Sequence, residues 1–520
     1  MSTLRFLYPR VLLSSKVPRA RKLVESSILE EICRKIDEQP VSFASLLDSN
    51  EENMNAIEKI QSPTLEIEKT TTRNKTVLEH YEDIKRKFPQ YFVLYQVGEF
   101  YEIYGSDVEE AANIMEIAQC KPSSRRPVPM TGVPLKNADC YIEKLIKAGK
   151  SVVLCDQSME KLLNGQEKFV RRISSIITPG TLTDDNLLDR KQNNFLLSIQ
   201  MPKFEDQNIG LAWIDVSTGF FAVKSISCLQ LESELLKINP KEIIIDEQSF
   251  ECHSSLKKLL KGMDVAVNFI PTEDMSISYL KTRLEEFIKL ELDKKKGYLD
   301  QFSVFELASM SALLGYLSRD SSSLTHIELP LRSSDDLSMS IDSNSFKSLE
   351  ILRNLKSGES RHSLLHIIDC TLTANGARLL QRKLQAPSLD IQFLNRQYDL
   401  IDMFRKNYKL TTDLRTILKP CHDLERCIQR LSLNRNSGGP RDMKLIGESL
   451  KLFPSIIALL RSIPNLVENH SNHAIITSLT ENLESFEPIQ KKIESALRDE
   501  VPARANEGGL IKEGFQLFLI

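Results

Sequence analysis

VLYQVGEFYEIYG, residues 93–105, is the segment that decides the fold of the N-terminal half of this chain. The run YFVLYQV (91–97) is rich in β-forming residues and has the length of a buried strand. In the GEFYE that follows, Phe100 and Tyr101 stand between two glutamates, although aromatic side chains are usually buried and carboxylates exposed. Side chains two residues apart point the same way in a strand, so Phe100 and Glu102 can project together. The same pentapeptide also suits core aromatics in a strand–turn–helix junction with solvated acids.

Three helices are predicted around this strand. Residues 77–88 carry apolar side chains on one helix face and stop before a proline. The spacing Ser106-x-x-Glu109 predicts a capping box that opens a second helix, and Asn137 begins a third. The side chains expected to face inward on the second helix are Val108, Ala111, Ala112 and Met115.

Two mixed α/β units follow from the order of these elements. CKPSSRRPVPMTGVP (120–134) is predicted to be a polar loop and SVVLCD (151–156) a strand, which completes a first unit over residues 74–190. The second unit, residues 193–321, has three strand-like runs with helical stretches after them. Those runs are NFLLSIQ, IGLAWIDVSTGFFAV (209–223) and KEIIIDE.

The remainder of the chain divides into a helical region and an N-terminal tail. Residues 335–520 are helix-periodic and lack strand runs, so the predicted fold class is multidomain α/β plus α. Residues 25–73 are an acidic, polar linker. Residues 1–24 contain no acid, and their composition is that of a mitochondrial transit peptide or of a merely basic tail. We favour the transit peptide and a mitochondrial matrix location; the basic residues are Arg5, Arg10, Lys16, Arg19, Arg21 and Lys22.

Composition sets limits on the function. With 520 residues, 27% of them charged, and a net charge of −3, the chain has no global basic surface for nucleic acid, although a local basic groove suffices. The sequence contains no run of 18 apolar residues, so no membrane span is predicted. The nine cysteines include no CxxC pair, and HSLLH (362–366) lacks the glutamate of HExxH, so no metal site is predicted.

An exposed Phe100 has a chemical use that a core phenylalanine does not. An apolar side chain can act as a wedge that enters a base step and kinks a DNA duplex. Unstacking costs on the order of a few kcal/mol, and least where the base is already mispaired, so a wedge prefers defective DNA. Phosphates repel a carboxylate beside DNA, so Glu102 is useful there only if it accepts a hydrogen bond from a base or is protonated.

Four motifs occur in an order that resembles the mismatch-recognition domain of the MutS family. They are GEFYE (98–102), MTGVP (130–134), CDQ (155–157) and TPGT (178–181). The resemblance continues through GLAWIDVSTGFF, NSFKSLEILRN and GGPRDM and covers roughly residues 74–515. Together with the basic N-terminus, it is greatest to the fungal mitochondrial members of the family. It implies a recognition domain, an RNase-H-like connector, and a helical core and lever domain with an incomplete clamp.

The resemblance also assigns roles to residues. Phe100 matches the stacking wedge of the family and Glu102 the acid that contacts the mispaired base. The implied partner is double-stranded DNA with mismatches or small loops. Our electrostatic inference adds Lys121, Arg125 and Arg126 as phosphate contacts, which position DNA without specifying sequence. After MTGVP, this chain has Leu135 and Lys136 where the family often has an aromatic residue and a histidine.

The ATPase of the family is expected to be missing from this chain. Its phosphate loop is G-x-x-x-x-G-K-[ST], and the only GK[ST] here is Gly149-Lys150-Ser151, with Lys144 at the position of the first glycine. The triplet is predicted to end a helix and enter a strand, the reverse of a phosphate-binding loop. We therefore expect no ATP or Mg²⁺ binding, no catalysis, a truncated family member, and a homodimer weakened by the missing domain.

The sequence leaves two alternatives to mismatch binding open. Asp215 and Asp246 each end a predicted strand, so an RNase-H-like nuclease with two metal ions is one. The other is an inactive truncated remnant or a generic structural DNA-binding module.

Overall fold

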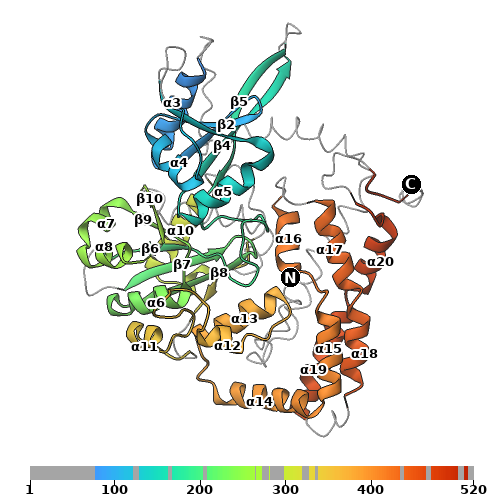
Figure 1. The fold of residues 1–520 in the computed structure, drawn as a ribbon. Helices are drawn as coiled ribbons and strands as arrows, with labels where there is room; N and C mark the ends of the chain where they lie inside the picture. Colours follow the sequence, from blue (N-terminus) through green and yellow to red (C-terminus); the bar gives the residue numbers. More distant parts are fainter. Residues whose placement is uncertain are drawn as a thin grey trace.

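The computed structural model describes residues 76–120, 128–161, 167–202, 208–263, 265–271, 280, 298–318, 327–333, 338–433, 439–463, 470–501 and 509–512. The predicted transit peptide and linker therefore lie outside the described residues, as do Lys121, Arg125 and Arg126. Figure 1 shows two α/β parts, blue to cyan and green to yellow, followed by an orange to red helical part. This agrees with the predicted fold class.

The first sheet has five strands in the order β3-β2-β1-β4-β5. β1 runs antiparallel to β2 and parallel to β4, and the outer pairs β2–β3 and β4–β5 are antiparallel. The strands are β1 Phe92–Val97, β2 Phe100–Tyr104, β3 Met130–Pro134, β4 Val152–Lys161 and β5 Glu167–Ile177.

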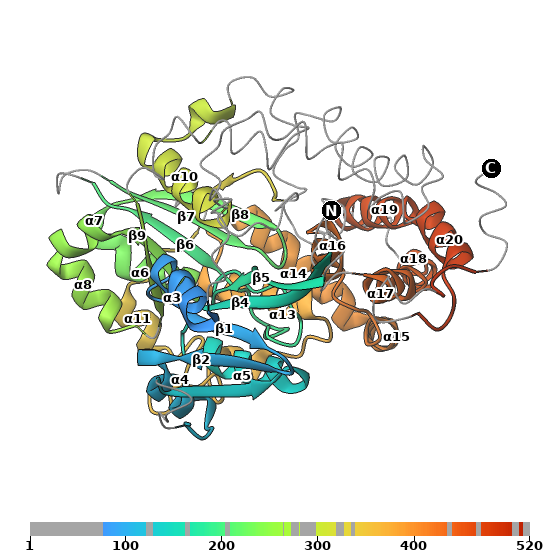
Figure 2. The same ribbon diagram turned by 90° about the horizontal axis from the view of Figure 1, so that it is seen from above.

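Helices cover both faces of this sheet (Figure 2). α4 (Val108–Met115) and α5 (Ala138–Lys147) pack on one face, and α3 (Val77–Lys87) packs on the other. The four side chains predicted to face inward on α4 are all buried. Because both faces are covered, β1 is an apolar run rather than an alternating one, with its first four residues buried.

Two local predictions in this unit are wrong. Ser106 and Glu109 form no capping box, because the Ser106 hydroxyl donates to Asp107 and α4 starts from a 3-10 turn. A capping box forms instead at the start of α3, between Thr76 and Glu79. The segment MTGVP is not a loop but strand β3, in which Gly132 lies opposite Glu102 and a Cβ would approach the Tyr101 carbonyl oxygen to 3.2 Å.

The second sheet is mixed and has the strand order β10-β9-β6-β7-β8-β11. α6 (Leu231–Ile238), α7 (Glu247–Cys252) and α8 (Ser254–Lys261) pack on one face and α10 (Val304–Ser318) on the other. The predicted single run 209–223 is a hairpin, because Gly219 turns the chain with a φ of +75°. The strands are β6 Leu196–Gln200, β7 Ile209–Asp215, β8 Phe220–Ile226, β9 Glu242–Asp246, β10 Ala266–Ile270 and β11 Leu331–Arg332.

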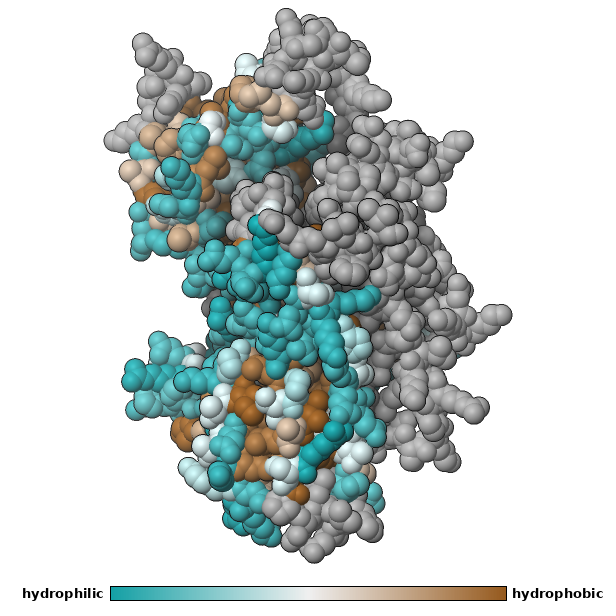
Figure 3. All heavy atoms as spheres, turned by 90° about the vertical axis from the view of Figure 1, so that its right-hand side faces the viewer, coloured by the Kyte–Doolittle hydropathy of each residue, from teal (hydrophilic) through white to brown (hydrophobic). Residues whose placement is uncertain are grey.

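The third part is helical, and its core joins residues of α14 to α20. Figure 3 shows an apolar area bordered by hydrophilic side chains on the lower half of the face in view, where the helical part lies in Figure 1. Among the described residues, no helix is long and apolar enough to cross a bilayer. The helices are α11 Ser343–Ser348, α12 Leu364–Ile368, α13 Ala374–Gln385, α14 Ile391–Lys406, α15 Tyr408–Leu418, α16 Leu424–Ser432, α17 Pro440–Leu450, α18 Phe453–Arg461, α19 His470–Glu484 and α20 Glu487–Ala496.

The TPGT segment joins the first unit to the second. Gly180 donates its backbone N–H to the buried carboxylate of Glu242 at 2.7 Å. A Cβ on Gly180 would lie 2.8 Å from the Cβ of Glu242, so only glycine fits without displacement. The other Glu242 oxygen accepts hydrogen bonds from Asn268 (2.8 Å) and Tyr316 (2.6 Å).

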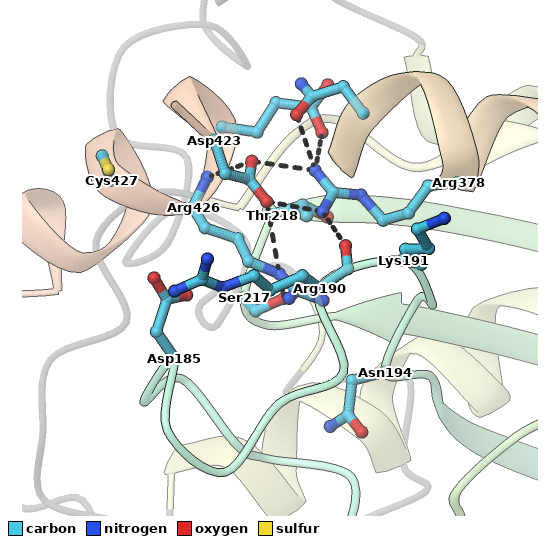
Figure 4. Close-up of polar contacts among 12 residues, drawn as sticks. Asp185, Arg190, Lys191, Asn194, Ser217, Thr218, Arg378, Asp423, Arg426 and Cys427 are labelled. Carbon is cyan, nitrogen blue, oxygen red and sulfur yellow. Dashed lines mark hydrogen bonds and ion pairs between the residues drawn. The ribbon is translucent and has the colours of Figure 1, made fainter. Parts of the chain in front are cut away.

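Two buried arginines attach the helical part to the other two (Figure 4). Arg426 on α16 donates to the carbonyl oxygens of Asp189 (3.0 Å) and Gln192 (2.8 Å), in the chain between the two sheets. Arg378 on α13 makes a bidentate pair with Asp423, at 2.6 and 2.9 Å, and contacts Glu425 at 3.0 Å. Both guanidinium groups are fully buried: Arg426 holds α16 to the chain between the two sheets, and Arg378 holds α13 to the start of α16 and donates to the Arg190 carbonyl oxygen at 3.2 Å.

Candidate nucleic-acid interface

The candidate interface starts at the β1–β2 hairpin. Val97 pairs with Phe100, so the loop contains only Gly98 and Glu99. Gly98 has a φ of +61°, which glycine adopts at the first position of a type II′ turn. The carbonyl oxygen of Glu99 accepts the backbone N–H of Leu135 at 3.0 Å, which ties the loop to the end of β3. Phe100 therefore stands at the tip of a braced hairpin.

The GEFYE segment does alternate, as the strand pattern predicted. Phe100 is 47% exposed and Tyr101 only 8% exposed. The Tyr101 hydroxyl donates to Asp156, and burial, with that hydrogen bond, raises the Tyr101 pKa well above its ordinary value. The core interpretation is thus right for Tyr101 and wrong for Phe100. Glu102 lies on the same face as Phe100, is half-buried, and accepts a hydrogen bond from the Tyr104 hydroxyl.

On the same face of the sheet as Phe100, Gln157 of β4 and Arg171 of β5 support the neighbouring strands. Val97 is paired to Phe100, and beyond it Gln157 pairs with Arg171. Arg171 donates to the Gln96 carbonyl oxygen (2.9 Å) and to Gln157 (2.8 Å), and its guanidinium lies 5.4 Å from the Tyr95 ring centroid. The glutamine of CDQ therefore supports the sheet beside Phe100.

Two further apolar residues, which the sequence motifs did not predict, lie on this face. Met159 and Phe169 pair with each other two residues beyond Gln157 and Arg171, so their side chains share the face of those two residues. Met159 is 61% and Phe169 55% exposed. The sequence pattern that could have identified them is a single large apolar residue with polar neighbours on each strand, Met159 in SMEK and Phe169 in KFVR. Phe100, Met159 and Phe169 together are called the apolar face below.

The Gly149-Lys150-Ser151 triplet does not fit a phosphate loop. It connects the end of α5 to the start of β4, as the sequence predicted. Lys150 pairs with Glu110 at 2.6 Å, and Ser151 is buried. A phosphate loop needs free backbone N–H groups at the start of a helix, and this junction has the opposite polarity.

Asp215 and Asp246 do not share a site. β7 and β9 run in opposite directions, so their C-terminal carboxylates lie at opposite ends of the sheet, about 15 Å apart along the strands. Two catalytic metal ions lie about 4 Å apart, so the nuclease hypothesis is wrong for this pair. Asp215 instead accepts hydrogen bonds from Ser217 and Asn194, and Asp246 caps α7 through the Ser249 N–H.

Of the two histidines of HSLLH, only His366 lies on a helix, α12. His362 precedes α12 with a φ of +67°, and its ring lies edge to face with that of His366, with centroids 6.2 Å apart. Over the described ranges, no three His, Cys, Asp or Glu side chains are grouped so that they could hold a metal ion.

Family comparisons match the three parts in order. The models for MutS domain I, domain II and domain III match residues 75–186, 194–328 and 344–514. The chain belongs to the MutS family. The GEFYE hairpin lies within its domain I, and Arg378 and Arg426 lie within its domain III.

Curated bacterial relatives of this MutS-family chain carry the name DNA mismatch repair protein MutS. The protein of Rhodopseudomonas palustris strain BisB5 is 31% identical over 457 residues, covering 86% of this chain and 48% of its own length. That of Desulforapulum autotrophicum is 30% identical over 457 residues, covering 86% and 50%. That of Ruegeria pomeroyi is 31% identical over 450 residues, covering 84% and 49%. The chain spans about half the length of these relatives.

Proposed function

We propose that this chain binds mismatched double-stranded DNA and acts as the lesion-reading part of mismatch repair. The observation that carries the proposal is the half-exposed Phe100 at a braced hairpin tip, on the same face as Glu102. Phe100 stacks on the mispaired base, and Glu102 accepts a hydrogen bond from that base. The family name and the bacterial relatives support this assignment.

The preference for mispaired over matched DNA arises because a mispaired base has already lost part of its stacking and pairing energy. A matched base pair must be unstacked before Phe100 can enter, whereas a mispair has lost part of that stability, so the wedge costs less there. Stacking of a base on an aromatic side chain contributes about 1–3 kcal/mol. A carboxylate is repelled by phosphates, so the Glu102 contact is favourable only where a base is in place to donate to it.

The other residues of the apolar face add contact area with DNA but do not distinguish a mispair from a matched pair. Met159 and Phe169 extend the apolar face along the β4–β5 hairpin, where they contact duplex that flanks the mispair. Lys121, Arg125 and Arg126 neutralise phosphates in this proposal. We also propose a mitochondrial role on the basis of the N-terminal sequence. We assign no nucleotide-dependent step to the Gly149-Lys150-Ser151 junction, because it leads from a helix into a strand and Lys150 pairs with Glu110.

Phe100→Ala tests the proposal. Fluorescence anisotropy with a short labelled duplex carrying one G·T mispair, and with its matched counterpart, measures the ratio of the two affinities. We expect the wild-type chain to prefer the mispair and the variant to bind both duplexes equally, with an unchanged salt dependence. A wild-type chain that binds both duplexes equally would instead support the remnant or generic DNA-binding alternative. A variant that keeps the preference would remove Phe100 as the wedge.

A further inference from the structure

β2 places a third side chain on the Phe100–Glu102 face, and that side chain is Tyr104. Its hydroxyl donates to Oε2 of Glu102. Its ring meets the ring of Tyr81 edge to face, with centroids 5.1 Å apart and an interplanar angle of 78°. Tyr81 is a buried residue of α3, the helix whose first turn has the Thr76–Glu79 capping box. A capped helix therefore supports the ring of the tyrosine that contacts the glutamate.

The hydrogen bond restricts a side chain that would otherwise be mobile. A glutamate has several rotatable bonds, and ordering such a side chain costs up to about 2 kcal/mol. A partly exposed Glu102 without a partner would pay this cost when DNA binds. A hydrogen bond to a charged group is stronger than a neutral one, and a group that is ordered in advance loses less on binding.

The two carboxylate oxygens of Glu102 differ in their surroundings. Within the described ranges, Oε2 accepts from Tyr104, and no hydrogen bond is made by Oε1. We propose that Tyr104 is a positioning residue, which holds Oε2 of Glu102 so that Oε1 is presented to the mispaired base. The inference rests on the proposed function, and it adds a specificity determinant that does not itself touch DNA.

A double-mutant cycle tests this role with the full chain. Tyr104→Phe keeps the ring against Tyr81 and removes only the hydroxyl. Glu102→Ala and the double variant complete the cycle, and the measured quantity is the ratio of affinities for the G·T and matched duplexes. We expect Tyr104→Phe to lower this ratio about three- to tenfold, which is the effect of losing one hydrogen bond. The affinity for the matched duplex should not change. In the Glu102→Ala background, the same substitution should change nothing.

The controls separate positioning from general damage. Tyr398→Phe removes a hydroxyl from an exposed tyrosine on α14 and should leave the ratio unchanged. An equal loss from Tyr104→Phe with and without Glu102 would mean that Tyr104 acts structurally, and no loss at all would mean that it does not act; either result overturns the inference. Failure of the proposed function is a different result, in which Phe100→Ala retains the preference for the mispair.

Discussion

Arg378→Met tests the buried ion pair that holds α13 to the start of α16, next to the chain between the two sheets. Wild-type Arg378 is fully buried and makes four hydrogen bonds to side chains, two to Asp423 and one each to Glu425 and Asn375, and one to the Arg190 carbonyl oxygen. Methionine fills much of the same volume but leaves the two carboxylates without this partner. Breaking a buried ion pair in this way costs about 3–5 kcal/mol.

An exposed ion pair in the same chain serves as the control for this loss of stability. Arg405 pairs with Asp402 at 2.9 Å on α14, and the Arg405 side chain is 79% exposed. Exposed pairs contribute about 0–1 kcal/mol, so Arg405→Met should have little effect. The difference between the two variants isolates burial from the loss of an arginine.

The pH dependence of the effect has a definite sign. Burial opposes the charge on Asp423, but hydrogen bonding and attraction by Arg378 outweigh burial and lower the Asp423 pKa. The ionised Asp423 therefore stabilises the wild-type fold above the unfolded pKa of about 3.9, and this contribution is lost as the pH falls through the lower folded pKa. Without Arg378, the Asp423 pKa rises, so protonation relieves the variant. The destabilisation should be largest near neutral pH and smaller in acid.

Hydrogen–deuterium exchange measures this effect locally, which suits a chain of several domains. Peptides that cover residues 186–194 and 423–430 should exchange about a hundredfold faster or more in Arg378→Met near neutral pH. Adding Asp423→Asn should restore part of the protection, because it removes the unpaired charge and keeps a side chain that can cap α16. Exchange within threefold of wild type, or an equal effect from Arg405→Met, would refute the reasoning.

Two further predictions concern the apolar face and the TPGT junction. Phe169→Ala should weaken binding to matched and mismatched duplexes alike, by a few-fold for an exposed contact, and leave their ratio unchanged in the anisotropy assay; a selective loss on the mispair would assign Phe169 to the base instead. Gly180→Ala should destabilise the junction by about 1–3 kcal/mol and lower the Tm in thermal unfolding, because the new Cβ would overlap Glu242 and Leu196. An unchanged Tm would mean that the junction relaxes around the new Cβ, and it would contradict this prediction.

Local pattern was sufficient for most elements of the first unit. The inward side chains of α4 and the strand β1 follow from apolar spacing, and the opposite faces of Phe100 and Tyr101 follow from the pleat of a strand. Local signals failed where packing outweighed them. MTGVP has the composition of a loop, yet it pairs with β2, because β3 is an edge strand and its proline lies at the end of the strand.

The order of motifs along the chain determined the family, the fold class and the wedge hypothesis, because these depend on residue identity and spacing alone. The tertiary structure decided what depends on distance between remote residues. It separated Asp215 from Asp246, because strand direction is not encoded in either segment. It brought Met159 and Phe169 onto the face of Phe100, placed Arg378 beside Asp423, and set the Tyr104 ring against Tyr81. Each of these contacts exists only after strands and helices far apart in sequence have packed together.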